Sequence, residues 1–267
     1  MTLISAHFIH KHWTTQWPGI HLGTQLADFD RIFAQSEVTC SRLGSVGVFN
    51  CEVAGDTRVD QVVQIANEPF KNEALEAFVR DHPVLVVGSN WPEDDAHLIP
   101  VLRRYKDCKV IVVPHELGDR QLSYWKEECQ RGLQTIDELE SSPKDETRVV
   151  YINRMGLLSK VYRYASVAYI GGGFGKAVHN TLEAMVYGIP VIFGPRNDRF
   201  LEVQRLKELG IGQQVKDDAE LEDALRRAME DMSYRASVRT KGQAFIQSQQ
   251  GATESIVAWI TEKLVDR

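Results

Sequence analysis

The chain has 267 residues, 43% of them hydrophobic, and a formal net charge of −6 at pH 7. This length fits one large domain or two small ones, and the apolar share is ordinary for a globular protein. The negative charge provides no general attraction for nucleic acid, so we expect no nucleic-acid partner. No apolar run approaches the ~20 residues that a membrane-spanning helix needs.

Residues 1–61 predict an incomplete Rossmann-like unit. Short strands are expected at 2–5, 31–34 and 51–54, with helical segments at 24–28 and 37–43. Three parallel strands make a poor free-standing sheet, because an edge or a face stays uncovered.

Two features of this first segment resemble metal-binding motifs, but we expect neither to bind a metal. The spacing of His7, His10 and His12 fits no common helical zinc pair, and neither Cys nor Asp completes a site nearby. Asp28-Phe29-Asp30 resembles an Asp-x-Asp metal motif, yet it precedes a predicted strand instead of following one. We therefore expect a loop at the first feature and a helix end with a turn at the second.

The four cysteines are scattered through the chain and form no CxxC pair. They are Cys40, Cys51, Cys108 and Cys129. Free thiols are the expected state for such a pattern.

Residues 62–267 predict a second α/β unit. Buried strands are expected at 84–87 and 110–113, followed by exit loops that contain Gly88-Ser89 and Pro114-His115. Ligands of open parallel sheets bind at this carboxyl edge, so Gly88, Ser89 and His115 are candidate phosphate or base contacts. Pro92, with Glu93 and Asp94 after it, suits the first turn of a helix.

The rest of this unit is less informative. Residues 117–148 are polar and favour a solvated helix and loop, followed by a strand at 149–152 and a helix at 157–164. Segments 219–232 and 234–248 are predicted as surface helices. The final segment, 255–265, is amphipathic.

The pattern of residues 166–195, the central stretch, predicts a strand, a glycine loop, a helix and a second strand. Gly171, Gly172, Gly173 and Gly175 let the backbone approach a ligand, and a helix starting near Asn180 directs free amides toward an anion. A tight strand–helix turn explains a glycine loop equally well.

Polar side chains around this loop complete a candidate nucleotide site. Lys176 and His179 can add charge or hydrogen-bond donors at a phosphate. Asn180 and Glu183 share a helix face, so Glu183 can accept hydrogen bonds from the ribose.

The order of these motifs resembles 3-deoxy-D-manno-octulosonic acid (Kdo) transferases, especially the form in Bacteroidetes-type bacteria. The central segments are YIGGGFGK (169–176), HNTLEA (179–184) and GIPVIFGP (188–195). Supporting segments are AGDTRVD (54–60), VGSNWPED (87–94), VPHE (113–116) and GLLSKVYRYA (156–165).

This resemblance implies the GT-B fold of two Rossmann-like domains. Residues 1–61 would be the end of the N-terminal domain and 62–267 the CMP-sugar-binding domain, with the helix at about 255–265 packing back on the first. The family's hydrophobic anchor and its Ser-Leu-Gly-Glu segment with the proposed catalytic base have no counterpart here, so we expect the C-terminal part of such an enzyme, inactive by itself. Many members carry Arg before the histidine where this chain has Pro114.

The resemblance also implies substrates, location and one catalytic residue. The family transfers Kdo from CMP-Kdo to lipid A precursor at the cytoplasmic face of the inner membrane, without a metal or other cofactor. Arg58 matches a cleft arginine and would stabilise charge on departing CMP, although it could simply pair with Asp56 or Asp60. His7 replaces the usual arginine on the acceptor side, and Trp13 and Trp17 could contact lipid.

Two other functions remain open. A UDP-sugar transferase or epimerase could use the same glycine loop and ribose-binding acid. A nucleotide-binding fragment without activity of its own would carry the same motifs.

Overall fold

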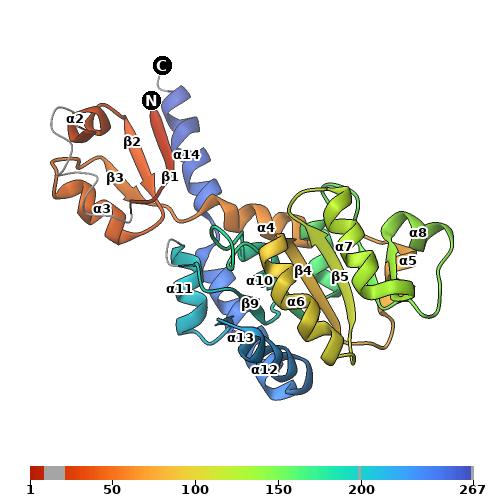
Figure 1. Cartoon of the computed structure of the whole chain (residues 1–267). Helices are drawn as coiled ribbons and strands as arrows, with labels where there is room; N and C mark the ends of the chain where they lie inside the picture. The colour runs from red at the N-terminus through yellow and green to blue at the C-terminus, as the bar shows by residue number, and fades with distance from the viewer. Residues whose placement is uncertain (9–21, 198–199, 266–267) are drawn as a thin grey trace. The chain divides into compact units, whose positions relative to one another are not determined.

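The structure, a computed structural model, describes residues 1–8, 22–197 and 200–265. Contacts divide the chain into two compact units, one formed by Met1–Val63 with Ile246–Arg267 and the other by Gln64–Phe245. Figure 1 shows the smaller unit in red and orange with the blue helix α14 (Ala252–Val265) beside its strands. The last residues therefore group with the beginning of the chain.

The smaller unit is a three-stranded parallel sheet with helices. Its order is β1-β2-β3, formed by β1 (Thr2–Ala6), β2 (Arg31–Ala34) and β3 (Cys51–Val53). On one face Ile32 packs with Leu43 of α3 (Glu37–Gly44) and with α2 (Leu22–Ala27). On the other, Phe33 meets Trp259 of α14 edge to face, with ring centroids 5.6 Å apart.

The expectation of four free thiols is wrong for two of them. Cys40 of α3 and Cys51 of β3 form a disulfide, because the helix returns antiparallel to the strand and brings their Cα atoms within 5.4 Å. Cys108 and Cys129 are free. Residues 28–30 form the predicted turn before β2.

The larger unit is built on a seven-stranded parallel sheet of order β10-β9-β8-β4-β5-β7-β6. Its strands are β4 (Val84–Asn90), β5 (Lys109–Pro114), β6 (Leu133–Thr135), β7 (Val149–Tyr151), β8 (Val167–Ile170), β9 (Val191–Phe193) and β10 (Gly212–Gln214). Its helices are α5 (Glu73–Val79), α6 (Pro92–Arg104), α7 (Asp119–Cys129), η1 (Gln130–Gly132), α8 (Ile136–Ser141), α9 (Leu158–Val161), η2 (Tyr162–Tyr164), α10 (Leu182–Met185), α11 (Leu201–Glu208) and α12 (Asp218–Glu230). Two further helices, α4 (Thr57–Asn67) and α13 (Met232–Gln249), each have residues in both units.

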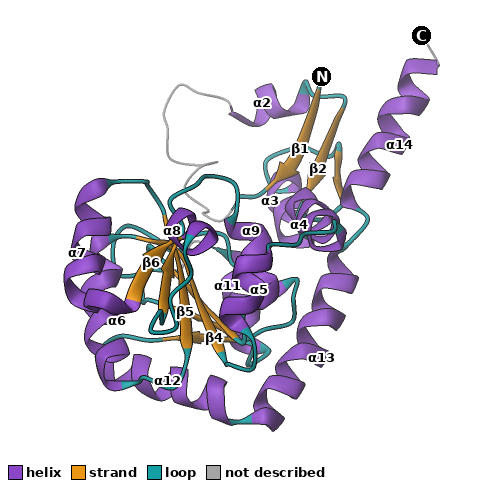
Figure 2. Cartoon of the chain, turned by 90° about the vertical axis from the view of Figure 1, so that its right-hand side faces the viewer, coloured by secondary structure: helices purple, strands orange, loops and turns teal. Residues whose placement is uncertain are grey.

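Helices cover both faces of this sheet. Successive side chains of a strand point to opposite faces, so Leu85 and Val87 pack under α6, α7 and α12, whereas Val84 and Val86 pack under the helices opposite. Figure 2 shows α6, α7 and α12 on one side of the strands and α5, α9 and α11 on the other. Burial on both faces explains why the central strands are continuous apolar runs.

One polar segment is more deeply integrated than predicted, and one predicted surface helix is found as expected. The stretch 117–148 was expected to be a solvated helix and loop, but it contributes the edge strand β6 and a fully buried Trp125. Helix α12 lies at the surface as expected, and it packs on the core through one apolar face that includes the fully buried Leu221 and Leu225. In both segments charged residues are frequent, and one apolar face is enough for packing.

Among the described residues, none of the helices has the length and apolar character required to cross a membrane.

Candidate functional site

The exit of β4 is a sharply shaped piece of backbone. The strand runs three residues further than predicted, and its register with β5 shifts between Gly88 and Asn90. Ser89 has a φ of 54°, a left-handed conformation that is uncommon for a residue with a side chain and occurs often at functional sites. A Cβ on Gly88 would lie 1.9 Å from the Tyr162 hydroxyl oxygen. Packing therefore explains Gly88, and the partly buried Ser89 marks the irregular end of β4 at the carboxyl edge.

The glycine loop after β8 packs tightly against other backbone segments. A Cβ on Gly171 would lie 2.3 Å from the Ser89 carbonyl oxygen, and one on Gly173 would lie 2.6 Å from the Gly194 nitrogen. Gly172 has a φ of 88°. These glycines allow the loops after β4, β8 and β9 to touch one another.

Three amides of this loop are already hydrogen-bonded within the protein and are not available to a phosphate, which corrects the sequence-based expectation. The Gly171 N–H donates to the Gly88 carbonyl at 2.8 Å, and the Gly172 N–H donates to the Asp94 carboxylate at 2.8 Å. The Gly175 N–H donates to the Gly172 carbonyl at 3.1 Å. Lys176 is exposed. A phosphate at this loop would have to bind side chains, or backbone amides other than those of Gly171, Gly172 and Gly175.

Asp94 is the buried carboxylate that holds the loop, although the sequence predicted it only as an acidic residue in the first turn of a helix. Its Oδ2 accepts from the backbone N–H of Trp91 at 2.9 Å as well as from Gly172. Its Oδ1 accepts from the Tyr169 hydroxyl at 2.8 Å. A single residue thus connects β8, the glycine loop and the start of α6.

The helix after the loop is shorter than predicted. It was expected to begin near Asn180 and run to Gly188, but α10 is one turn with Thr181 at its N-cap. The Gly188 N–H bonds to the Met185 carbonyl, three residues back, and Gly188 has a φ of 67°. A single turn has little macrodipole, so the helix-dipole argument for phosphate binding is not supported.

Asn180 and Glu183 meet as the spacing predicted. The Asn180 side-chain amide donates to Glu183 Oε1 at 3.1 Å, while its Oδ1 accepts from the Leu182 N–H at 3.1 Å. Glu183 is half-buried, and burial raises the pKa of its carboxyl group. The carboxylate also acts electrostatically on Tyr162, the residue packed against Gly88. A half-buried acceptor near the exit of β4 suits a sugar hydroxyl.

Three aromatic rings form a cluster at the carboxyl edge. His115, after β5, and His179 are stacked with centroids 4.2 Å apart, and the Trp91 ring lies 4.5 Å from His115. The Trp91 Nε1–H donates to His179 Nε2 at 2.9 Å. Burial, followed by the charge on a protonated His115, lowers the pKa of His179. Both histidines were predicted from the sequence; Trp91 was missed as a functional residue.

Asp95 lies in a second buried network beneath this cluster. Its Oδ1 accepts from Asn90 Nδ2 at 2.5 Å and its Oδ2 from Gln121 Nε2 at 2.6 Å. The Asn90 carbonyl accepts from the His115 N–H at 3.2 Å, so the network supports the loop that carries His115.

Protonation of Asp95 should stabilise the larger unit. Burial raises the pKa of its carboxyl group from 3.8 to about 6. The folded state therefore binds the proton more tightly, and this stabilisation is complete below pH 3.8 and lost as the pH rises through about 6. Compared with Asp95→Asn, which does not titrate, the wild type should gain roughly 2 kcal/mol between pH 7 and pH 4 in urea unfolding followed by circular dichroism. An unchanged difference between the two proteins would contradict the assignment.

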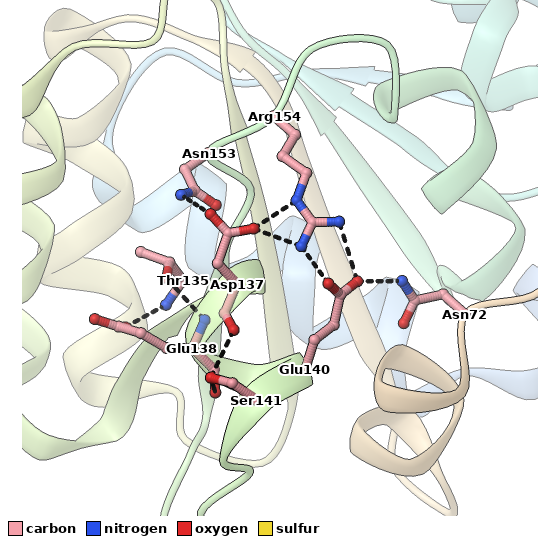
Figure 3. A network of polar contacts seen from close by, with 8 residues as sticks. All are labelled: Asn72, Thr135, Asp137, Glu138, Glu140, Ser141, Asn153 and Arg154. Atoms are coloured by element: carbon pink, nitrogen blue, oxygen red, sulfur yellow. Dashed lines mark hydrogen bonds and ion pairs between the residues drawn. The ribbon is translucent and has the colours of Figure 1, made fainter.

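A charged network occupies another part of the same sheet edge, after β6 and β7. Figure 3 shows Arg154 between Asp137 and Glu140 of α8, with Asn72 and Asn153 at its two ends. Arg154 Nε donates to Asp137 Oδ1 at 2.6 Å, and Asn72 Nδ2 donates to Glu140 Oε1 at 2.8 Å. Two carboxylates thus balance the charge of Arg154, so we do not count Arg154 among the candidate nucleotide-binding residues.

Arg58 belongs to the smaller unit, at the start of α4. Its guanidinium forms a fork to Asp56, with Nη2–Oδ2 at 2.6 Å and Nε–Oδ2 at 3.0 Å. This is the ion pair that the sequence offered as the alternative to a catalytic role, and that role stays a prediction.

The metal hypothesis gains no support in the described part of the chain. Residues 1–8, 22–197 and 200–265 contain no group of three or more side chains placed to hold a metal ion. His10, His12, Trp13 and Trp17 lie outside the described residues.

Both units have parallel α/β sheets, and the fold is that of GT-B glycosyltransferases. The C-terminal CMP-Kdo binding domain of WaaA from Acinetobacter baumannii aligns with a TM-score of 0.56 and 20% identity, over 72% of this chain and 98% of that domain. A candidate UDP-N-acetylglucosamine 2-epimerase from Listeria monocytogenes aligns with a TM-score of 0.64 and 13% identity, over 100% of this chain and 68% of that protein. The expected fold class is confirmed.

The sequence comparisons point to one group within this fold. The chain is 25% identical to the 3-deoxy-D-manno-octulosonic acid transferase of Rickettsia typhi over 73% of this chain and 43% of that protein. It is 24% identical to the enzyme of the same name from Chlamydia muridarum, over 83% of this chain and 53% of that protein. No family model matches the chain. The predicted resemblance to Kdo transferases is confirmed, and the chain spans about half, or less, of these relatives' length.

Proposed function

We propose that this chain is the donor-binding part of a glycosyltransferase that moves Kdo from CMP-Kdo to a lipid A precursor. The named relatives and the fold support the reaction class. The observation that carries the proposal is the convergence of Ser89, His115 and His179 at one sheet edge, with the Asn180–Glu183 pair directly after His179. Parallel sheets bind their ligands at this edge.

In this proposal each side chain has one task at the nucleotide. Glu183 accepts from the ribose hydroxyls, and Asn180 orients its carboxylate. Ser89, Lys176 and His179 donate to the phosphate, and His115 lies against the base or phosphate. Gly88, Gly171, Gly172 and Gly173 act indirectly, by allowing the loops to pack closely.

Breaking the bond between CMP and Kdo leaves negative charge on the CMP phosphate. We assign stabilisation of that charge to the donors around His179, because a preorganised donor contributes ~3 kcal/mol to such a step. A catalytic role for Arg58 is proposed by resemblance alone. The acceptor hydroxyl needs a general base, and we expect a carboxylate outside this chain to supply it. We propose no metal or other cofactor and no nucleic-acid partner. We place the reaction at the cytoplasmic face of the inner membrane, by resemblance alone.

Nucleotide selectivity tests the donor assignment. Calorimetric titration of the chain with CMP, UMP and UDP should show the tightest binding for CMP. A clear preference for UDP would favour a UDP-sugar transferase or epimerase with the same fold. Robust Kdo transfer by this chain alone would contradict the expectation that its base lies elsewhere.

The role of Glu183 can be tested with a substitution of equal size. Glu183→Gln removes the charged acceptor, and a hydrogen bond to a charged group is worth about 1.5–3 kcal/mol, so CMP should bind at least about tenfold more weakly. Glu208→Ala is the control, because within the described residues this exposed residue of α11 forms an ion pair only with Arg205. Equal affinity of the wild type and Glu183→Gln for CMP would show that Glu183 does not bind the nucleotide.

A further inference from the structure

Trp91 contacts both histidines of the aromatic cluster. Its ring packs against His115 with centroids 4.5 Å apart, and its Nε1–H donates to His179 Nε2 at 2.9 Å. Its own backbone N–H is held by the buried Asp94 at 2.9 Å, directly before Pro92 begins α6. The indole is therefore attached to a rigid part of the fold.

This hydrogen bond selects one tautomer of His179. An indole N–H is a donor only, so His179 Nε2 must be the unprotonated nitrogen and the proton of the neutral ring lies on Nδ1. Burial lowers the pKa of His179 and so favours this neutral ring.

The orientation of the ring places the two nitrogens on different sides. A Cβ built on Gly172 would lie 2.9 Å from His179 Cδ2 and 3.1 Å from Nε2, so this edge of the ring lies over the glycine loop. Nδ1 belongs to the opposite edge of the five-membered ring. The nitrogen that carries the proton is therefore directed away from Gly172 and Trp91.

We propose that Trp91 is a positioning residue that holds His179 in its Nδ1–H tautomer, so that the uncharged His179 ring donates a hydrogen bond to an anionic oxygen of the bound nucleotide. This inference rests on the proposed function and adds Trp91 to the residues that determine donor binding. Trp91 itself does not touch the ligand; it acts through the ring of His179.

The matched variant is Trp91→Phe, which retains an aromatic ring against His115 and removes the N–H donor. In ¹⁵N-histidine NMR spectra of the ligand-free chain, wild-type His179 should show protonated Nδ1 and unprotonated Nε2. In Trp91→Phe the proton should shift toward Nε2, which is the common tautomer of an unconstrained imidazole. His82, an exposed residue at the other end of β4, is the internal reference and should not change.

Binding then tests whether the tautomer serves the ligand. Trp91→Phe should weaken CMP binding about fivefold, because only the fraction of His179 rings that keep the proton on Nδ1 can then donate to the anionic oxygen. In a His179→Gln background the same change should have no further effect, because the residue through which Trp91 acts is absent. Equal losses in both backgrounds, or an unchanged His179 tautomer, would overturn the proposal. If the wild type shows the Nδ1–H tautomer but binds no CMP, the proposed function fails while the positioning of His179 by Trp91 stands.

Discussion

Replacing Gly171 with alanine should strongly destabilise the larger unit. The new Cβ would lie 2.3 Å from the Ser89 carbonyl oxygen and 2.4 Å from the Asn90 Cα. Both are backbone atoms, so relief requires the β4 exit and the β8 loop to separate. We expect a loss of about 3 kcal/mol or more, which lowers the melting temperature by roughly 6–12 °C in calorimetry, and loss of CMP binding.

The same loop offers the control. A Cβ on Gly175 would meet its nearest neighbouring atom at 3.6 Å, an ordinary contact. Gly175→Ala should therefore melt within about 1 °C of the wild type. If the two alanine variants melted at the same temperature, the close packing of the β4 and β8 loops would be disproved.

Removal of the Asp94 carboxylate is the second large effect that we expect. Asp94→Ala would leave three donors without an acceptor: the buried Gly172 amide and Tyr169 hydroxyl, and the partly buried Trp91 amide. Each unsatisfied buried group costs about 1–3 kcal/mol, so the variant should lose about 4 kcal/mol in urea unfolding and should not bind CMP.

Asp94→Asn separates hydrogen bonding from charge. The asparagine oxygen can accept from the two amides, and its NH₂ group can donate to the Tyr169 hydroxyl oxygen, so every buried group keeps a partner. This variant should lose only about 1 kcal/mol. A similar loss in the alanine and asparagine variants would show that the three hydrogen bonds do not organise the site.

The sequence was most informative where burial alone decides structure. The strands that became β4, β5, β8 and β9 are apolar runs buried on both faces, and their exit loops share one edge in any parallel sheet. For this reason Ser89, His115 and His179 were identified together. The Asn180–Glu183 contact followed from local spacing.

The sequence was misleading where local patterns have two physical explanations. Glycines permit close approach by any group, and in Gly171 and Gly173 that group is another part of the backbone and not a phosphate. An acid in the first turn of a helix usually faces solvent, whereas Asp94 turns inward to three donors that are distant in sequence. Trp91 gave no signal, because its partner lies 88 residues away.

Protection from hydrogen–deuterium exchange by CMP is the most direct test of where the nucleotide binds. At saturating CMP we expect slower exchange of backbone amides in peptides that cover 88–91, 113–116 and 173–183, with little change elsewhere in the larger unit. Protection that instead maps to the opposite end of the strands, around the cavity lined by Arg103, Cys129 and Arg148, would contradict this expectation.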